Sequence, residues 1–258
     1  MDSILFSVEN GVAKITLNRP KVYNSFNREM ALSMQAKLDE CASNQAIRAI
    51  YLTGEGKAFC AGQDLQEAID PDGPELSTIV SEHYNPIIQR IRNIEKPVIA
   101  AINGVAAGAG ANIALACDIT IATESASFIQ AFSKIGLIPD SGGTFFLPRI
   151  IGMQKASALM MLGDKISARD AESMGMIYKM VADDEFAETS YAIAKTLAKM
   201  PTKGLGYTKK LLNQSYTNNL TEQLAAEDKY QTIAGNTFDY NEGVNAFLEK
   251  RKPEFKGE

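Results

Sequence analysis

The chain has 258 residues, of which 45% are hydrophobic and 22% charged, a composition typical of a globular protein rather than a disordered or fibrous one. Its 31 acidic and 26 basic residues give a formal net charge of −5 without a basic stripe, so we expect no nucleic-acid partner. One histidine and three widely spaced cysteines offer no ligand set for a metal, and no apolar run could cross a membrane, so we expect a cytoplasmic protein with free thiols and no membrane contact.

The N-terminal part of the chain predicts a β-hairpin followed by a helix. Alternating residues over 4–8 and 12–17 flank Asn10-Gly11, a strong signal for a two-residue hairpin turn. Asn27 is a suitable cap for a helix whose apolar residues recur at steps of three and four. These residues, which we expect in the core, are Met30, Met34, Leu38 and Cys41.

Two glycine-bearing turns follow predicted strands. A strand over 47–52 leads into a turn over 53–65, and a strand over 97–102 leads into the turn and helix of 103–118. The N–H groups at a helix start are unpaired, so they suit an anion or a carbonyl oxygen that becomes negative. A pure packing role for these glycines is the alternative.

Between these turns, a loop at 70–74 precedes a predicted helix over 77–93. This helix carries the single histidine, His83, which we interpret as a surface or boundary residue. The turn residues Gly108-Ala109-Gly110 only partly match a dinucleotide fingerprint, because Ile113 stands where a third small residue is needed. A nicotinamide dehydrogenase is therefore a weaker alternative.

The second half alternates strands and helices before it becomes entirely helical. Short strands are expected at 119–122 and 127–129, and a short helix from Ser167 to Gly175 precedes a strand over 176–181. From 183 onward the pattern is helical, with a break at Pro201. We therefore predict an α/β fold with a largely parallel arrangement, composed of a core over 1–200 and a helical C-terminal region over 201–258.

Asp140 stands out because it is a lone carboxylate among apolar residues in the run GLIPDSGGTFF. Helix capping is one role for an aspartate just before a helix, and acid/base catalysis is the other. Both roles are compatible.

Several motifs spread along the chain resemble those of the enoyl-CoA hydratase/isomerase, or crotonase, superfamily. The motifs are the segments 18–20, 58–65, 103–119, 136–144 and 246–251. The resemblance implies a crotonase-like ββα superhelix core and a helical C-terminal trimerisation region, in a homotrimer or a hexamer made of two trimers. It also implies an acyl-CoA thioester as substrate and no separate cofactor, since CoA is part of that substrate.

The resemblance also assigns site residues by their positions in these motifs. The oxyanion-hole donors match the N–H groups of Gln63 and Ala109, and the acid/base residue matches Asp140. The CoA-binding positions match Val22, Ala61, Gln63, Asp64 and Leu65, with Phe247 and Lys250 contributed by a neighbouring subunit.

Two departures from the family pattern reduce the number of candidate reactions. Asn112 and Phe132 stand where the hydratases have two glutamates, and neither side chain can deprotonate a water. Asp140 matches the catalytic aspartate of the ring 1,2-epoxyphenylacetyl-CoA isomerases, and one carboxylate suffices for a proton shift between two carbons. We therefore expect an acyl-CoA isomerase that converts the ring epoxide to an oxepin, a 3-enoyl-CoA to a 2-enoyl-CoA, or both. An enoyl-CoA hydratase, or another crotonase-type acyl-CoA enzyme, is the alternative.

Overall fold

The computed structural model describes residues 2–258, and its core contains a six-stranded and a four-stranded sheet. In the larger sheet β1 and β2 form the expected antiparallel hairpin, and the remaining neighbours are parallel. Asn10 and Gly11 both have positive φ, at 50° and 79°, as a tight hairpin turn requires. In spatial order the strands are β1 (Ile4–Glu9), β2 (Val12–Leu17), β3 (Ala49–Gly54), β5 (Val98–Ile102), β7 (Ile119–Thr123) and β10 (Lys179–Val181).

The smaller sheet consists of three-residue strands, in which β9 is antiparallel to β8 and the other pairs are parallel. Its strands, in order, are β4 (Ala58–Cys60), β6 (Val105–Ala107), β8 (Ser127–Ile129) and β9 (Lys165–Ser167). Each of the pairs β3–β4, β5–β6 and β7–β8 sends one strand to each sheet before a helical segment follows. The chain therefore repeats a ββα unit, as the family resemblance implies.

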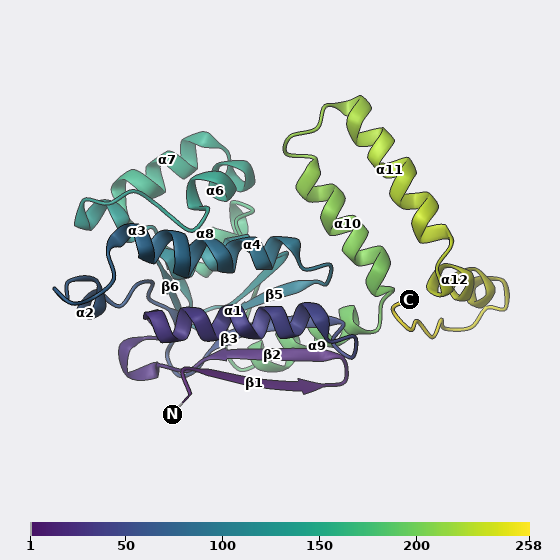
Figure 1. Ribbon diagram of the computed structural model, residues 1–258, viewed down its shortest axis with the longest axis horizontal. Helices are drawn as coiled ribbons and strands as arrows, with labels where there is room; N and C mark the ends of the chain where they lie inside the picture. The colour runs from purple at the N-terminus through teal and green to yellow at the C-terminus, as the bar shows by residue number, and fades with distance from the viewer. Residues whose placement is uncertain (1) are drawn as a thin grey trace.

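The helices of the core cover both faces of the larger sheet (Figure 1). The predicted helix α1 (Arg28–Ser43) is confirmed: the Asn27 side chain accepts a hydrogen bond from the Met30 N–H at 3.0 Å, and the predicted apolar stripe is buried. The other helical elements are η1 (Pro20–Val22), α2 (Leu65–Ala68), α5 (Ala109–Ala116), η3 (Ala131–Ile135), α6 (Gly143–Ile151), α7 (Met153–Leu162), α8 (Ala168–Ser173) and α9 (Phe186–Ala198).

The predicted single helix over 77–93 is divided in the structure. It consists of α3 (Leu76–Thr78), the π-helical turn η2 (Ile79–Tyr84) and α4 (Asn85–Asn93). Hydrophobic periodicity does not distinguish a π turn from an α turn, and such turns occur frequently at functional sites. His83 and Tyr84 lie in this π-helical segment.

The larger sheet is buried on both faces, as a parallel sheet between helices should be. On β3, Ile50 and Leu52 belong to the cluster that includes residues of α1 and α4. Their neighbours Ala49 and Tyr51 belong to a second cluster with α9. The alternation along one strand thus joins the sheet to a helical layer on each side.

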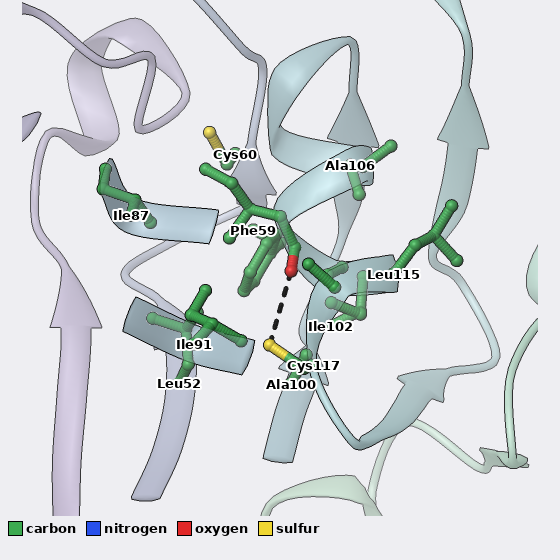
Figure 2. Close-up of a cluster of buried hydrophobic side chains, with 14 of the residues drawn as sticks. Leu52, Phe59, Cys60, Ile87, Ile91, Ala100, Ile102, Ala106, Leu115 and Cys117 are labelled. Atoms are coloured by element: carbon green, nitrogen blue, oxygen red, sulfur yellow. Dashed lines mark hydrogen bonds between the residues drawn. The ribbon is translucent and has the colours of Figure 1, made fainter. Parts of the chain in front are cut away.

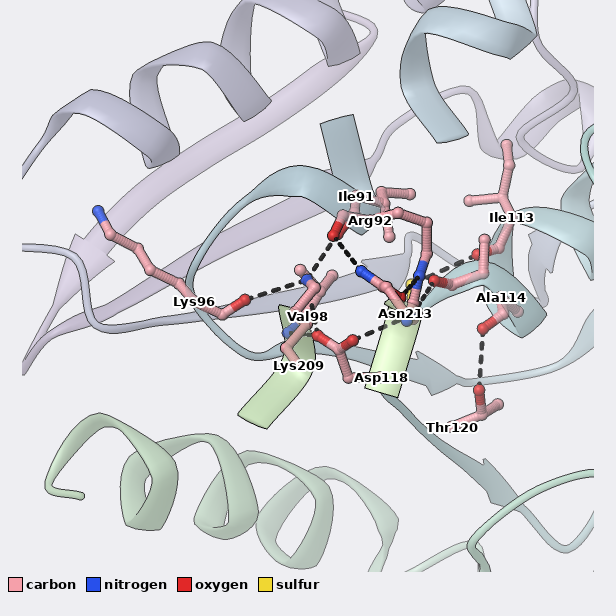
Figure 3. Close-up of polar contacts among 12 residues, drawn as sticks. Ile91, Arg92, Lys96, Val98, Ile113, Ala114, Asp118, Thr120, Lys209 and Asn213 are labelled. Atoms are coloured by element: carbon pink, nitrogen blue, oxygen red, sulfur yellow. Dashed lines mark hydrogen bonds and ion pairs between the residues drawn. The ribbon is translucent and has the colours of Figure 1, made fainter. Parts of the chain in front are cut away.

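The C-terminal helices α10 (Thr202–Gln214), α11 (Leu220–Gly235) and α12 (Phe238–Leu248) confirm the all-helical pattern and lie to one side of the sheets (Figure 1). A polar network fastens α10 to the core (Figure 3). Lys209 Nζ and Arg92 Nη1 pair with the Asp118 carboxylate at 2.8 and 3.1 Å, and the Asn213 side chain donates to the Arg92 carbonyl at 2.9 Å. Burial lowers the pKa of Lys209, and the Asp118 charge opposes that shift.

Within residues 2–258, no helix is long and apolar enough to cross a membrane. Over the same residues, no group of three or more histidine, cysteine or acidic side chains could hold a metal ion.

Candidate active site

The two glycine-bearing turns of the sequence meet in the structure. Gly62 has a φ of +95°, and a Cβ atom there would lie 3.1 Å from the Ala107 carbonyl oxygen and 3.4 Å from the Ala109 nitrogen. A side chain at position 62 would therefore be strained and would push the turns apart. Glycine at this position lets the segment after β4 pack directly on the start of α5.

The two N–H groups expected to form an oxyanion hole lie on these touching turns. Gln63 follows Gly62, and Ala109 is the first residue of α5. In the part of the chain that the structure describes, neither N–H donates to another protein group, although the neighbouring N–H groups of Asp64 and Gly108 donate to Phe26 and Ile129 at 2.8 and 2.9 Å. Two free donors on adjacent turns form a site suited to an oxygen that gains negative charge.

The turns rest on a tightly packed apolar cluster, part of which is shown in Figure 2. Cys60 of β4 belongs to this cluster, and its sulfur accepts the Gly62 N–H at 3.4 Å. A Cβ atom on Gly110 would come within 2.7 Å of that sulfur and 2.4 Å of the Cys60 carbonyl oxygen. Burial raises the pKa of the Cys60 thiol to about 12, so Cys60 packs the site and is not a nucleophile. Cys41 and Cys117 are likewise buried free thiols, as expected.

The side chain of Gln63 is held in place from two directions. Tyr84, which is fully buried, donates from its hydroxyl to Gln63 Oε1 at 3.0 Å, and Gln63 Nε2 donates to a Glu67 carboxylate oxygen at 3.1 Å. Burial raises the pKa of Tyr84 well above its ordinary value, and nearby acidic groups, including Asp140, add to the shift. Tyr84 therefore remains a neutral donor beside the site. Tyr84 was not predicted as a site residue, because hydrophobic periodicity does not reveal the π-helical turn in which it lies.

Asp140 is partly buried and lies three residues before α6. The N-cap of α6 is Gly142 and no side chain caps this helix, so the capping role considered for Asp140 is wrong. Desolvation raises the pKa of its carboxyl, and the hydrogen bond that Ser141 Oγ donates to it at 2.9 Å partly opposes the shift. Ser141 and Gly142 have φ values of +50° and +75°, so the chain turns sharply after Asp140. Ile138, two residues before Asp140 in the apolar run, is 81% exposed in the single chain, so the burial of the carboxyl comes from other parts of the fold.

The two positions that carry glutamates in the hydratases hold buried side chains of other kinds, and one of them contacts Asp140. Asn112 is fully buried on α5, and its Nδ2 donates to the Asp140 carbonyl oxygen at 2.9 Å. Phe132 is buried on η3, with its ring 3.8 Å from where a Gly108 Cβ would be. Gln130 donates to Asn112 Oδ1 at 2.8 Å. Gln130 was not predicted as a site residue, because its contact with Asn112 joins segments 18 residues apart in the sequence.

The expected CoA-binding positions of the first turn are partly exposed. Val22 and Leu65 are 37% and 55% exposed, Ala61 is also exposed, and its N–H donates to the Tyr23 carbonyl, next to Val22, at 3.0 Å. Asp64 caps α2 by accepting the Gln66 N–H at 3.1 Å and pairs with Arg19 at 2.8 Å. Asp64 thus has a structural role in shaping this turn.

Phe247 and Lys250 lie far from that region within one chain. Phe247 is on α12 and is 83% exposed, and Figure 1 places α12 at the opposite end of the molecule from α2. A single chain therefore does not bring these two residues to the first turn.

His83 differs from its expectation, which was wrong. It is 1% exposed rather than a surface residue, and within residues 2–258 neither ring nitrogen has a hydrogen-bond partner. Burial lowers the pKa of His83, so the neutral imidazole is favoured. Hydrophobic periodicity could not reveal this, because it does not distinguish the π-helical turn that carries His83 from an α-helical one.

A cavity of about 520 Å³ lies elsewhere, between α10 and the core. Arg92, Phe146 and Lys209 are among its lining residues, whereas Gln63, Ala109 and Asp140 are not. It is therefore separate from the candidate catalytic groups.

Comparison with known proteins shows which family this chain resembles in sequence and structure. Residues 7–258 match the family described as enoyl-CoA hydratase/isomerase. The 1,2-epoxyphenylacetyl-CoA isomerase of Escherichia coli (strain K12) is 49% identical over 260 residues, covering 100% of this chain and 99% of that protein. A Rhodobacter capsulatus protein named "Probable enoyl-CoA hydratase" is 45% identical, covering 99% and 98%. The crystal structure of an enoyl-CoA hydratase from Bacillus anthracis matches with a TM-score of 0.93 at 33% identity, covering 99% of this chain and 100% of that one.

The fold and its repeated ββα units are those of a crotonase-type enzyme, so the expected fold class is confirmed. The chain belongs to the enoyl-CoA hydratase/isomerase, or crotonase, superfamily. It is accordingly an enzyme of the acyl-CoA isomerase/hydratase class.

Proposed function

We propose that this protein is an acyl-CoA isomerase in which Asp140 transfers the proton and the N–H groups of Gln63 and Ala109 stabilise the enolate. One observation carries the proposal: Asp140, whose carboxyl pKa is raised by burial, is bonded through its main-chain carbonyl to Asn112 of α5, the helix whose first N–H is free. The neighbouring positions 112 and 132 hold an amide and an aromatic ring, which supply no second base.

The chemistry follows from this arrangement. A thioester oxygen between the two N–H groups gains charge when the carbon next to the carbonyl loses a proton, and one such donor contributes about 2.7 to 4 kcal/mol to transition-state stabilisation. Asp140 takes that proton as a base and returns it, as an acid, at a carbon two bonds further along. No water is consumed, so substrate and product are isomers.

The candidate reactions are ring 1,2-epoxyphenylacetyl-CoA to oxepin-CoA, 3-enoyl-CoA to 2-enoyl-CoA, or both. The first is favoured by the relative of 49% identity that is named for that epoxide. Enoyl-CoA hydration is the alternative, favoured by the relative of 45% identity whose name is a hydratase. The chemistry at positions 112 and 132 argues against hydration.

We further propose that CoA is recognised by Val22, Ala61, Gln63, Asp64 and Leu65, with no cofactor beyond the CoA of the substrate. Because Phe247 and Lys250 lie so far away in one chain, their proposed contribution requires a neighbouring subunit in a homotrimer or a hexamer.

The test compares three reactions of the wild-type enzyme: isomerisation of a 3-enoyl-CoA, conversion of the ring epoxide, and hydration of crotonyl-CoA. Ultraviolet absorbance and mass spectrometry distinguish the products, because hydration adds the mass of water and isomerisation adds nothing. We expect at least one isomerisation to proceed with hydration near background. Hydration at a rate comparable to the fastest isomerisation would refute the assignment of Asn112 and Phe132 and would support the alternative.

A further inference from the structure

The candidate base and one of the candidate oxyanion donors are tied together by a buried pair of amides. Asn112 lies three residues after Ala109 on α5, so the two share a helix face, and Asn112 reaches the carbonyl oxygen of Asp140 at 2.9 Å. Gln130, two residues before Phe132, donates to Asn112 Oδ1 at 2.8 Å. Asn112 and Gln130 are 0% and 3% exposed.

The direction of these hydrogen bonds is fixed by the Asp140 carbonyl. A carbonyl can only accept, so the amide nitrogen of Asn112 must face it and the amide oxygen must face Gln130. Gln130 must then present its own nitrogen, which leaves Gln130 Oε1 buried without a partner in the described chain. An unpaired buried oxygen costs stability, so a chain that tolerates it is retaining this orientation at a cost.

The loop is shaped to meet the amides. The same Asp140 carbonyl also accepts the Gly143 N–H at 2.8 Å, so both of its lone pairs are used. A Cβ atom on Gly143 would lie 2.4 Å from Asn112 Nδ2, so only glycine there lets the loop approach Asn112 so closely. The contact between Asn112 and the Asp140 loop therefore depends on residues of both segments, the amide on α5 and the glycine in the loop.

From this geometry we infer that Asn112 and Gln130, together called the amide bracket, are positioning residues that hold the Asp140 backbone at a fixed place relative to the Ala109 N–H. The inference rests on the proposed role of Asp140. The position that carries a catalytic glutamate in the hydratases serves here to place a different carboxylate. Proton transfer requires close alignment of base and substrate, and a displacement of 1 Å can cost about 100-fold in rate.

The experiment compares Asn112→Leu, Gln130→Met and the double variant with the wild type. Thr120→Val is the matched control, since Thr120 Oγ1 makes another buried hydrogen bond to α5, to the Ala114 carbonyl at 2.9 Å, and this bond involves neither Asp140 nor the two amides. We expect kcat for the 3-enoyl-CoA to fall about 10- to 100-fold in Asn112→Leu and less in Gln130→Met. Affinity for a saturated acyl-CoA should stay near wild type, and the double variant should resemble Asn112→Leu because the two amides act as one unit.

A second measurement decides the inference without relying on turnover. Hydrogen–deuterium exchange of the Gly143 amide should quicken most in Asn112→Leu, because the Asp140 carbonyl that it bonds loses its bond to Asn112. It should quicken less in Gln130→Met, where Asn112 loses only its own support, and not in Thr120→Val. A wild-type protein without isomerase activity would contradict the proposed function. The exchange rate at Gly143 would then still test whether the amide bracket holds the Asp140 backbone. Folded variants that keep wild-type kcat and wild-type exchange at Gly143 would overturn the bracket while leaving the isomerase proposal intact. Gln130→Met leaves the Asn112 to Asp140 bond in place, so it provides the test if Asn112→Leu does not fold.

Discussion

At Asp140, burial and reactivity are linked, because desolvation raises the pKa of the carboxyl above its ordinary value of 3.8. A base must be ionised to accept a proton, so we expect kcat/KM to fall as the pH drops through this raised pKa. The measurement is a pH profile of kcat/KM in Asp140→Glu and wild type. An acid limb at the ordinary aspartate value in the wild type would show that desolvation does not tune the base.

The same shift has a consequence for stability. The folded-state pKa is raised, so the stabilising contribution of protonated Asp140 is complete below the unfolded pKa and is lost as pH rises through the folded pKa. At neutral pH the ionised, desolvated carboxylate therefore costs stability. Replacing it with a neutral amide should not lower the melting temperature at neutral pH.

Tyr84 gives a second residue-scale prediction. Its hydroxyl donates to Gln63 Oε1 at 3.0 Å, so Tyr84→Phe frees the side chain that follows the Gly62 turn. We expect a loss of about 0.5 to 1.5 kcal/mol in the free energy of unfolding and a fall in kcat/KM with retained activity. Thermal denaturation and steady-state kinetics test this. Unchanged kinetics alongside the stability loss would confine Tyr84 to a packing role.

At the scale of elements, the approach of β4 to α5 depends on Gly110. A Cβ atom there would meet Cys60 oxygen and sulfur at 2.4 and 2.7 Å, so Gly110→Ala should push the two turns apart and remove most activity. The matched control is Gly235→Ala at the end of α11, where nothing lies within 4 Å and a helical alanine stabilises by up to about 1 kcal/mol. Activity and melting temperature should fall in the first variant and be maintained in the second. Wild-type activity in Gly110→Ala would show that the spacing of the turns is not critical.

The elements also show what the sequence could and could not predict. The hairpin, α1 and the C-terminal helices were predicted because each carries a complete local signal: Asn10-Gly11, the Asn27 cap, or a sustained helical period. Strands β4, β6 and β9 have three residues each and were missed, whereas β8, of the same length, was predicted at its observed position. The strand expected over 47–52 begins two residues later, and the one over 176–181 is reduced to Lys179–Val181, because pairing with neighbouring strands sets the ends of a strand.

The residues of the candidate site likewise include some that the sequence predicted and some that it did not. Asp140, Gln63 and Ala109 stand in motifs that can be read along the chain, and the structure places the last two on turns in contact. Tyr84, Gln130 and the buried state of His83 were not foreseen, because their positions depend on a π turn and on contacts between distant segments. Local pattern thus identifies residues in turns, whereas their support is a tertiary property.

At the scale of the whole molecule, we propose that the boundary near residue 200 separates two regions that do not fold independently. Lys209 and Asn213 of α10 are bonded to Arg92 and Asp118 of the core, so α10 depends on the core for its polar partners (Figure 3). The region beyond α10 carries exposed apolar side chains such as Phe247 and Leu248 at 83% and 71%, which fits a contact with another subunit.

Assembly gives the prediction at this scale. Phe247→Asp changes an exposed residue of α12, so the fold of one chain should persist while the proposed trimer weakens and CoA affinity falls with it. Sedimentation velocity and calorimetry with CoA measure the two effects. Tyr178→Asp, at a 67% exposed position in the core, is the control for adding a charge to the surface. A Phe247→Asp variant that dissociates yet binds CoA like wild type would contradict a CoA site shared between subunits.

The account centres on Asp140 as the only proton carrier of the isomerisation, and Asp140→Asn tests this most directly. The variant keeps the shape of the side chain and the Asp140 main-chain carbonyl that Asn112 holds, and it removes the base. We predict that turnover of the 3-enoyl-CoA, or of the ring epoxide if that is the faster substrate, is abolished, while calorimetry gives an acyl-CoA affinity within several-fold of wild type. Near wild-type isomerisation by folded Asp140→Asn would contradict the account, because the proton would then move through another group.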